Sequence, residues 1–195
     1  MSDPLGIDVA YPQGPDYDWR QWRGKISFGM CKVTEGLTIT DPYFANNWNA
    51  MCELSHTMPR FGYHYFHASD DPVEQAERFV ATIKPHGLLP GDNLVLDLEA
   101  TESNGANDNE APATVADRAR TFLNTANGLA RDHRVLVYTN PGFAETGACG
   151  PESLVPLGRR LWRQLAGCAS TVVALDVLAE RRHAGGRRPF QRHRG

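Results

Sequence analysis

The sequence has no run of apolar residues long enough to cross a membrane. No stretch of its 195 residues approaches the ~20 apolar residues that a transmembrane helix needs. The first residues, MSDPLGIDVAYPQ, do not show the basic and then apolar pattern of a secretory signal peptide. We therefore expect no membrane insertion and no export by the general secretory route, with the protein staying cytoplasmic until it is released.

Cysteine is also scarce. The four cysteines lack the C-x-x-C spacing that marks many zinc sites and redox motifs, and they are few for this length. We expect buried small side chains or free thiols rather than a zinc site or a disulfide framework. The sequence indicates no metal and no cofactor. The four positions are Cys31, Cys52, Cys149 and Cys168.

Acidic residues outnumber basic ones through most of the chain, and the balance then reverses. Residues 1–157 hold 11 Lys and Arg against 21 Asp and Glu, whereas residues 158–195 hold 9 Arg against 2 acidic residues. A hydrophobic content of 41% is typical of a globular protein, and the length allows one domain with a sizeable core. The abrupt reversal separates the last 38 residues from the rest.

Strand-like and helix-like patterns alternate from residue 6 to about residue 145. Helices are expected to begin at Asp41 and Asp71, because each aspartate precedes a proline that favours the first helical position. The alternation predicts parallel strands joined by helical crossovers, an α/β architecture. The expected strands are 6–10, 25–36, 60–68, 93–100 and 134–140, and the expected helices are 41–56, 70–84 and 114–132. An apolar stripe is expected on the second helix, formed by Val73, Ala76, Phe79, Val80 and Ile83.

The fourth expected strand, NLVLDLEA, ends in two acids. Asp97 and Glu99 are two residues apart, so an extended strand turns both toward the same face. Neighbouring carboxyls shift each other's proton affinity, and glycoside hydrolysis uses such pairs. Two solvated acids at an exposed strand end are the alternative. Asp8 lies near the end of the first strand, where the carboxyl ends of parallel strands carry catalytic groups.

Five segments together resemble the glycoside hydrolase family 25 lysozymes, the muramidases of phage lysins and bacterial autolysins. They are GIDVA, CKVTEG, GYHYFHA, LVLDLEAT and VLVYTNPGF, and the resemblance covers residues 5 to about 157. It implies a TIM-like (β/α) barrel with a substrate groove, and cleavage of the β-1,4 bond between N-acetylmuramic acid and N-acetylglucosamine in peptidoglycan. The implied partner is a peptidoglycan glycan strand at the cell wall, bound by a monomer, with no nucleic acid.

The resemblance also implies roles for the three acids. Glu99 is the expected general acid. Asp97 is expected to orient the substrate's N-acetyl group or to stabilise the developing charge, and Asp8 is a third acid of the site. Substrate assistance and direct attack by water both remain open as mechanisms.

Three further residues are candidates for substrate binding. Tyr63 and Tyr138 lie near strand ends, where aromatic faces can stack on sugars, and packing in the core is the alternative for each. Lys32 has apolar neighbours in a strand, so we expect it to pair with an active-site acid unless it is a surface lysine. His64 and His67, three apart on a strand, should face opposite sides and form no chelating pair.

The resemblance stops near residue 157. The family continues with further strands and closes on a V-D-x-x-x-F-N-G motif, whereas this chain continues with an Arg-rich segment. Synonymous codons exist for residues 157–193 that read W-V-A-D-Y, T-F-W-Q and V-D-x-R-F-N-G in order in a shifted frame. We infer a catalytic domain at 1–157 and a frameshifted tail at 158–195.

That inference implies an incomplete barrel, because the last strands would be missing. Open sheet edges and the loss of a further aspartate predict a poorly stable chain with weak or no activity. A genuine basic extension that binds anionic cell-wall polymer or nucleic acid is the alternative for the tail. A remnant that binds glycan without cutting it is the alternative for the whole chain.

Overall fold

The structure is a computed structural model, and it describes residues 5–56, 58–100, 106–139 and 143. These residues contain a six-stranded sheet in the order β1-β2-β4-β5-β6, with β3 paired to β2 off that path. Pairing is parallel along the order and antiparallel only between β2 and β3. The strands are β1 Gly6–Val9, β2 Phe28–Glu35, β3 Ile39–Thr40, β4 Arg60–Tyr65, β5 Asn93–Asp97 and β6 Arg134–Tyr138.

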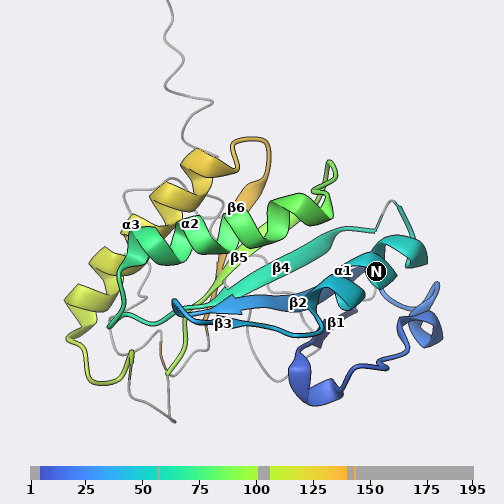
Figure 1. Ribbon diagram of the computed structural model, residues 1–195, viewed down its shortest axis with the longest axis horizontal. Helices are drawn as coiled ribbons and strands as arrows, with labels where there is room; N and C mark the ends of the chain where they lie inside the picture. Colours follow the sequence, from blue (N-terminus) through green and yellow to red (C-terminus); the bar gives the residue numbers. More distant parts are fainter. Residues whose placement is uncertain (1–4, 57, 101–105, 140–142, 144–195) are drawn as a thin grey trace, which may run out of the picture.

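Three α-helices connect the parallel strands and pack on one face of the sheet. Figure 1 shows α2 and α3 side by side, while α1 packs against β2 and β4. The expected α/β architecture is confirmed. The helices are α1 Phe44–Leu54, α2 Pro72–Ile83 and α3 Pro112–Leu129, and three short 3-10 helices are η1 Tyr11–Gln13, η2 Trp19–Trp22 and η3 Lys84–His86.

Side-chain alternation gives the two faces of the sheet different roles. The face under the helices holds the main apolar core, to which the strands contribute residues such as Cys31, Leu94, Leu96, Val135 and Val137. The opposite face holds a smaller cluster that contains no helix residue. It consists of Tyr63, Val95 and Leu136, with Met30, Phe61 and Tyr138 packed against them.

The two Asp-Pro signals act differently. Asp71 caps α2 as expected, since its Oδ1 accepts hydrogen bonds from the backbone N–H groups of Val73 and Glu74. Asp41, by contrast, accepts from the N–H of Tyr43 in a turn, and α1 begins only at Phe44. The prediction that α1 begins at Asp41 is therefore wrong by about one helical turn.

The expected apolar stripe on α2 is correct except at its first member. Ala76, Phe79, Val80 and Ile83 are buried, but Val73 is 37% exposed because it lies in the first turn, at the edge of the packed face. No helix of the described residues is long and apolar enough to span a bilayer.

Several expectations fall outside the described residues. Cys149, Cys168 and the Arg-rich tail at 158–195 belong to that part of the chain, as does any strand that would complete the barrel. Of the cysteines that are described, Cys31 is buried, Cys52 is partly buried, and both are free thiols.

Candidate functional site

Asp8, Asp97 and Glu99 come together at one edge of the sheet. Asp8 is the third residue of β1, Asp97 is the last residue of β5, and Glu99 follows two residues later. All of these strands run parallel, so their carboxyl ends share one edge. The side chains are close enough for the charge of Glu99 to affect the proton affinity of both aspartates.

The surroundings of the two aspartates change their protonation, although Asp8 is exposed and Asp97 is only partly buried. Desolvation by the neighbouring protein atoms raises the pKa of Asp8 from 3.8 to about 7; the Val9 N–H and Lys32 act in the opposite direction, while Glu99 adds to the rise. Desolvation also raises the pKa of Asp97 well above 3.8, and the charges of Glu99 and Asp8 add to this rise. No hydrogen-bond partner among the described residues reaches Asp97 Oδ1. The cluster can therefore retain a proton near neutral pH.

A β-bulge in β2 brings a cation and a further acid to the same face. Lys32 pairs with Tyr63 of β4 but Thr34 pairs with His64, so Val33 is an additional residue in the strand. The side chains of Val33 and Thr34 are both buried on the helix side. Without the bulge, residues 32 and 35 would face opposite sides; with it, Lys32 forms an ion pair with Glu35.

Lys32 is thus not a surface lysine, since its side chain is 16% exposed. Its direct partner is Glu35, and its Nζ lies 5.0 Å from the centroid of the Tyr65 ring. The positive charge of Lys32 also opposes the rise in the pKa of Asp8 and of Asp97. The ion pair of Lys32 is therefore with Glu35, an acid that the sequence did not single out, and the charge of Lys32 acts on Asp8 and Asp97 only at longer range.

His67 lies between Glu35 and a further acid, Asp70, at the carboxyl edge of the sheet. Its Nε2 lies 3.3 Å from Glu35 Oε1, and its Nδ1 lies 3.5 Å from Asp70 Oδ2. The contact with His67 and the ion pair with Lys32 hold the pKa of Glu35 at about 2, although partial burial acts in the opposite direction. Glu35 therefore stays charged and keeps Lys32 in place.

The two candidate tyrosines lie on the face that carries the acids. Tyr63 is 8% exposed and packs with Val95 and Leu136, which agrees with the alternative that it is a core residue. Burial and the charges of Asp8 and Asp97 raise its pKa, so its hydroxyl stays protonated beside the acids. Tyr138 is partly buried against the same cluster and is paired with Asp97 in the sheet register.

The histidine pair is separated as expected. His64 is fully buried on the helix side, where it stacks on Phe122 at 5.0 Å between ring centroids and hydrogen-bonds Thr34 and Gln75. Burial lowers its pKa to about 3, so it is neutral. The described part of the chain holds no cluster of three His, Cys, Asp or Glu side chains arranged for a metal ion.

Sequence reasoning missed three residues that build the site. Glu35 pairs with Lys32, the Tyr65 hydroxyl donates to the carbonyl of Ala100 at 2.9 Å, and the Asn107 amide donates to the carbonyl of Glu99 at 2.7 Å. The i,i+2 spacing of Tyr63 and Tyr65 was a usable signal for Tyr65. Asn107 lies in a polar loop, where no periodic pattern identifies it.

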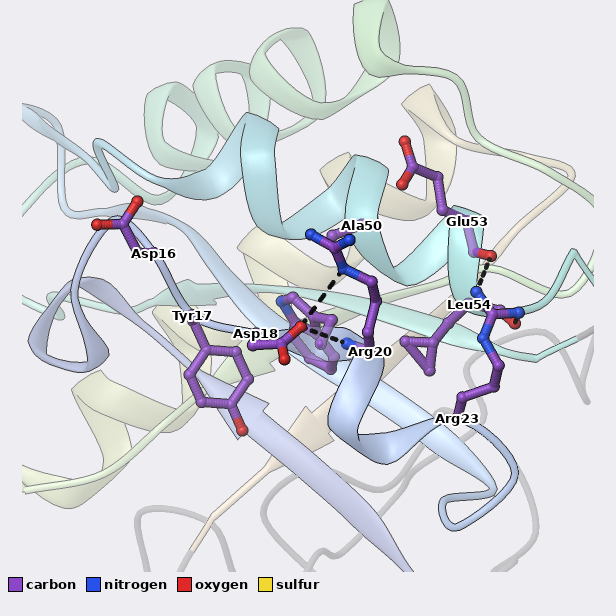
Figure 2. A pocket seen from close by; sticks show the side chains of 9 residues that line it. Asp16, Tyr17, Asp18, Arg20, Arg23, Ala50, Glu53 and Leu54 are labelled. Carbon is purple, nitrogen blue, oxygen red and sulfur yellow. Dashed lines mark hydrogen bonds and ion pairs between the residues drawn. The ribbon is translucent and has the colours of Figure 1, made fainter.

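A separate hollow of about 390 Å³ lies where the segment around η2 meets the end of α1, and Figure 2 shows its lining. Arg23 donates to the carbonyls of Glu53 and Leu54 there, which caps the last turn of α1. Arg20 and Asp18 form an exposed pair. The hollow mixes both charge signs and contains none of the three acids of the sheet edge.

Comparisons with solved structures show where this fold recurs. A family 25 glycosyl hydrolase from Bacillus anthracis matches with a TM-score of 0.62 and 24% identity over 72% of this chain and 62% of that chain. The bacterial lysozyme from Streptomyces coelicolor matches with a TM-score of 0.60 and 23% identity, covering 76% and 68%. A family 25 lysozyme from Aspergillus fumigatus gives 0.64 and 17%, covering 74% and 68%. The fold is therefore the TIM-like α/β barrel of these proteins.

Sequence comparison gives the same family. The uncharacterised protein YegX of Escherichia coli (strain K12) is 37% identical over 101 residues, which are 48% of this chain and 35% of YegX. The chain thus spans about a third of the length of this relative. The profile of the glycosyl hydrolases family 25 matches residues 7–162, most of the sequence. The chain therefore belongs to family 25 of the glycosyl hydrolases.

Proposed function

We propose that this chain is a glycoside hydrolase that cleaves the β-1,4 bond between N-acetylmuramic acid and N-acetylglucosamine in peptidoglycan. The observation that carries the proposal is the cluster of Asp8, Asp97 and Glu99 at the carboxyl edge of the sheet, where Asp8 is exposed, Asp97 and Glu99 are partly buried, and the surroundings raise the pKa of both aspartates. Family membership supports it. The similar autolysin LytC of Streptococcus pneumoniae has been solved with a synthetic peptidoglycan ligand.

The chemistry divides among the three acids. Glu99 donates its proton to the glycosidic oxygen as the bond from that oxygen to the sugar C1 breaks. Asp97 orients the N-acetyl group or stabilises the positive charge that develops on the sugar ring. Water then adds to C1 and returns a proton to Glu99. Asp8 is the third acid of the site. Because the three carboxyls interact, the protons that they bind are shared among them rather than assigned to one residue.

The remaining predicted residues support this site from the same face. Tyr138 is partly buried beside the acids and offers aromatic surface to a sugar, whereas Tyr63 packs in the cluster on that face with its hydroxyl protonated near the acids. Lys32, fixed by Glu35, limits how far the pKa values of Asp8 and Asp97 rise. The protein would act as a monomer on the cell wall after release from the cytoplasm, with no nucleic-acid partner, no membrane insertion and no cofactor.

The test is Glu99→Gln, assayed on soluble peptidoglycan strands. A lost proton donor should lower the hydrolysis rate by about 10²- to 10⁴-fold while glycan binding persists. Glu77→Gln, on an exposed position of α2, is the matched control and should leave the rate unchanged. Equal hydrolysis by both variants would reject the proposal, and binding without hydrolysis by the parent chain would favour a glycan-binding remnant.

The boundary near residue 157 is part of the proposal. The family match ends at residue 162, close to the point where the composition changes and from which synonymous codons can be chosen that read family motifs in a shifted frame. Sequencing the coding DNA across codons 150–165 should reveal a missing or additional base. A confirmed read without one would leave the Arg-rich segment as a true part of the protein.

A further inference from the structure

We propose that Asn107 is a positioning residue for Glu99: its side-chain amide fixes the backbone of the proposed acid by bridging the ends of β4 and β5. The proposal rests on the proposed function for the role of Glu99, but not for the geometry. Asn107 lies in the loop before α3, ten residues after the end of β5, and is 2% exposed.

The Asn107 amide uses both of its donors and its acceptor. Its Nδ2 donates to the carbonyl of Phe66 at 2.9 Å and to the carbonyl of Glu99 at 2.7 Å. Its Oδ1 accepts from the N–H of Ala68 at 2.6 Å. Two bonds thus hold the segment after β4 and one holds the segment after β5. A buried amide satisfied in this way is geometrically specific, because any displacement leaves a buried polar group unpaired.

The position of these bonds matters because the sheet is ending there. The backbone ladder extends one residue beyond each strand, with Phe66 N–H bonded to the Asp97 carbonyl and Leu98 N–H bonded to the Tyr138 carbonyl, both at 2.9 Å. Farther along the same segment, the carbonyl of Glu99 is held by Asn107, and the carbonyl of Ala100 is held by the Tyr65 hydroxyl at 2.9 Å. Side chains thus continue the restraint that the ladder began.

This restraint should act on catalysis rather than on substrate binding. Proton transfer depends on the carboxyl position to within about 1 Å, and misplacement by that distance can cost about 100-fold in rate. The proposed sugar-binding residue Tyr138 belongs to β6, whereas Asn107 joins the segments that follow β4 and β5. Loosening the segment should therefore lower kcat while KM changes little.

Two variants test the clamp. Asn107→Ala removes all three bonds, and Asn107→Asp keeps the volume and the acceptor but loses both donors when ionised. Hydrogen–deuterium exchange should become faster at residues 98–100, with the rest of β4 and β5 unchanged. On soluble peptidoglycan strands, kcat should fall by about 10- to 100-fold with KM held within about twofold.

Asn47→Ala is the matched control, because Asn47 is also a buried asparagine whose Oδ1 accepts a hydrogen bond, from Trp19. Asn47→Ala should lower the free energy of unfolding, but hydrogen exchange at residues 98–100 and the value of kcat should stay as in the parent chain. Unchanged exchange at 98–100 in both Asn107 variants, or an increase spread evenly over the sheet, would overturn the inference. If Glu99→Gln leaves hydrolysis unchanged, the proposed function fails, and local exchange at 98–100 alone decides the clamp.

Discussion

Two aspartates at opposite ends of β5 have opposite surroundings. Asp92, just before the strand, is 4% exposed and is bonded by Arg60 through both carboxylate oxygens, at 3.0 and 2.5 Å. The N–H of Leu89 adds a third bond at 2.7 Å. Asp97, at the other end, has a buried Oδ1 that no described residue hydrogen-bonds. One strand thus carries a fully compensated acid and an incompletely compensated one.

The difference shows how this barrel separates stability from chemistry. Arg60 also donates to the carbonyls of Trp48 and Gly87 and lies 4.0 Å from the centroid of the Trp48 ring, so the amino end of the sheet is tied together. An unpaired buried carboxyl costs free energy unless it binds a proton. The carboxyl end bears that cost at Asp97, whose Oδ1 is buried, and Asp97 and Asp8 there hold their protons more tightly than free aspartates do.

The largest expected effect comes from breaking the compensated end. Arg60→Met leaves Asp92 buried without its cation and should lower the free energy of unfolding by about 3–5 kcal/mol. Urea unfolding followed by circular dichroism measures this. Activity per folded molecule should stay the same, because Arg60 lies at the end of the sheet away from the three acids. A loss below about 1 kcal/mol would show that the pair is not an important source of stability.

The next effect comes from neutralising the uncompensated end. Asp97→Asn should lower hydrolysis of peptidoglycan strands by about 100-fold, the typical effect of losing one polar group that acts on the transition state. Stability at pH 8 should be equal or higher, because the amide carries no buried charge. Asp92→Asn is the matched control and should show the reverse: lower stability with activity retained. Equal behaviour of the two variants would remove the contrast between the ends.

A smaller effect should appear as a dependence of stability on pH. The folded chain binds the Asp8 proton more tightly than the unfolded chain, with a pKa of about 7 against 3.8. This group's contribution is fully present below pH 3.8 and is lost as the pH rises through about 7. The Tm should therefore fall between pH 5 and pH 8, and Asp8→Asn should flatten that part of the curve. A parallel curve for the variant would contradict the assignment.

The sequence was sufficient where simple periodicity operates. Asp97 and Glu99 were expected to share a face because they are two residues apart, and Asp8 was expected beside them because parallel strands end at one edge. The structure brings all three together. The capping role of Asp71 was readable for the same reason, since an N-cap depends on local residues alone.

The remainder depends on interactions between distant segments. Asp41 has the same Asp-Pro signal as Asp71, but its other oxygen accepts from Tyr11 N–H, 30 residues away, and the helix begins later. The contact between Lys32 and Glu35 requires a β-bulge that no residue type in β2 predicts. Asn107 acts on groups 8 to 41 residues away, which a loop composition cannot reveal.

The additional residue in β2 also affects how relatives should be aligned. A strand with one residue more than its neighbour requires a gap within the strand, whereas most alignment schemes place gaps in loops. If a relative lacks the bulge, an ungapped comparison will match either Lys32 or Glu35 to a side chain on the wrong face of the sheet. Family 25 sequences should therefore be aligned separately before and after Val33. Deletion of Val33 would move either Lys32 or Glu35 to the opposite face of the sheet, which no point substitution can do.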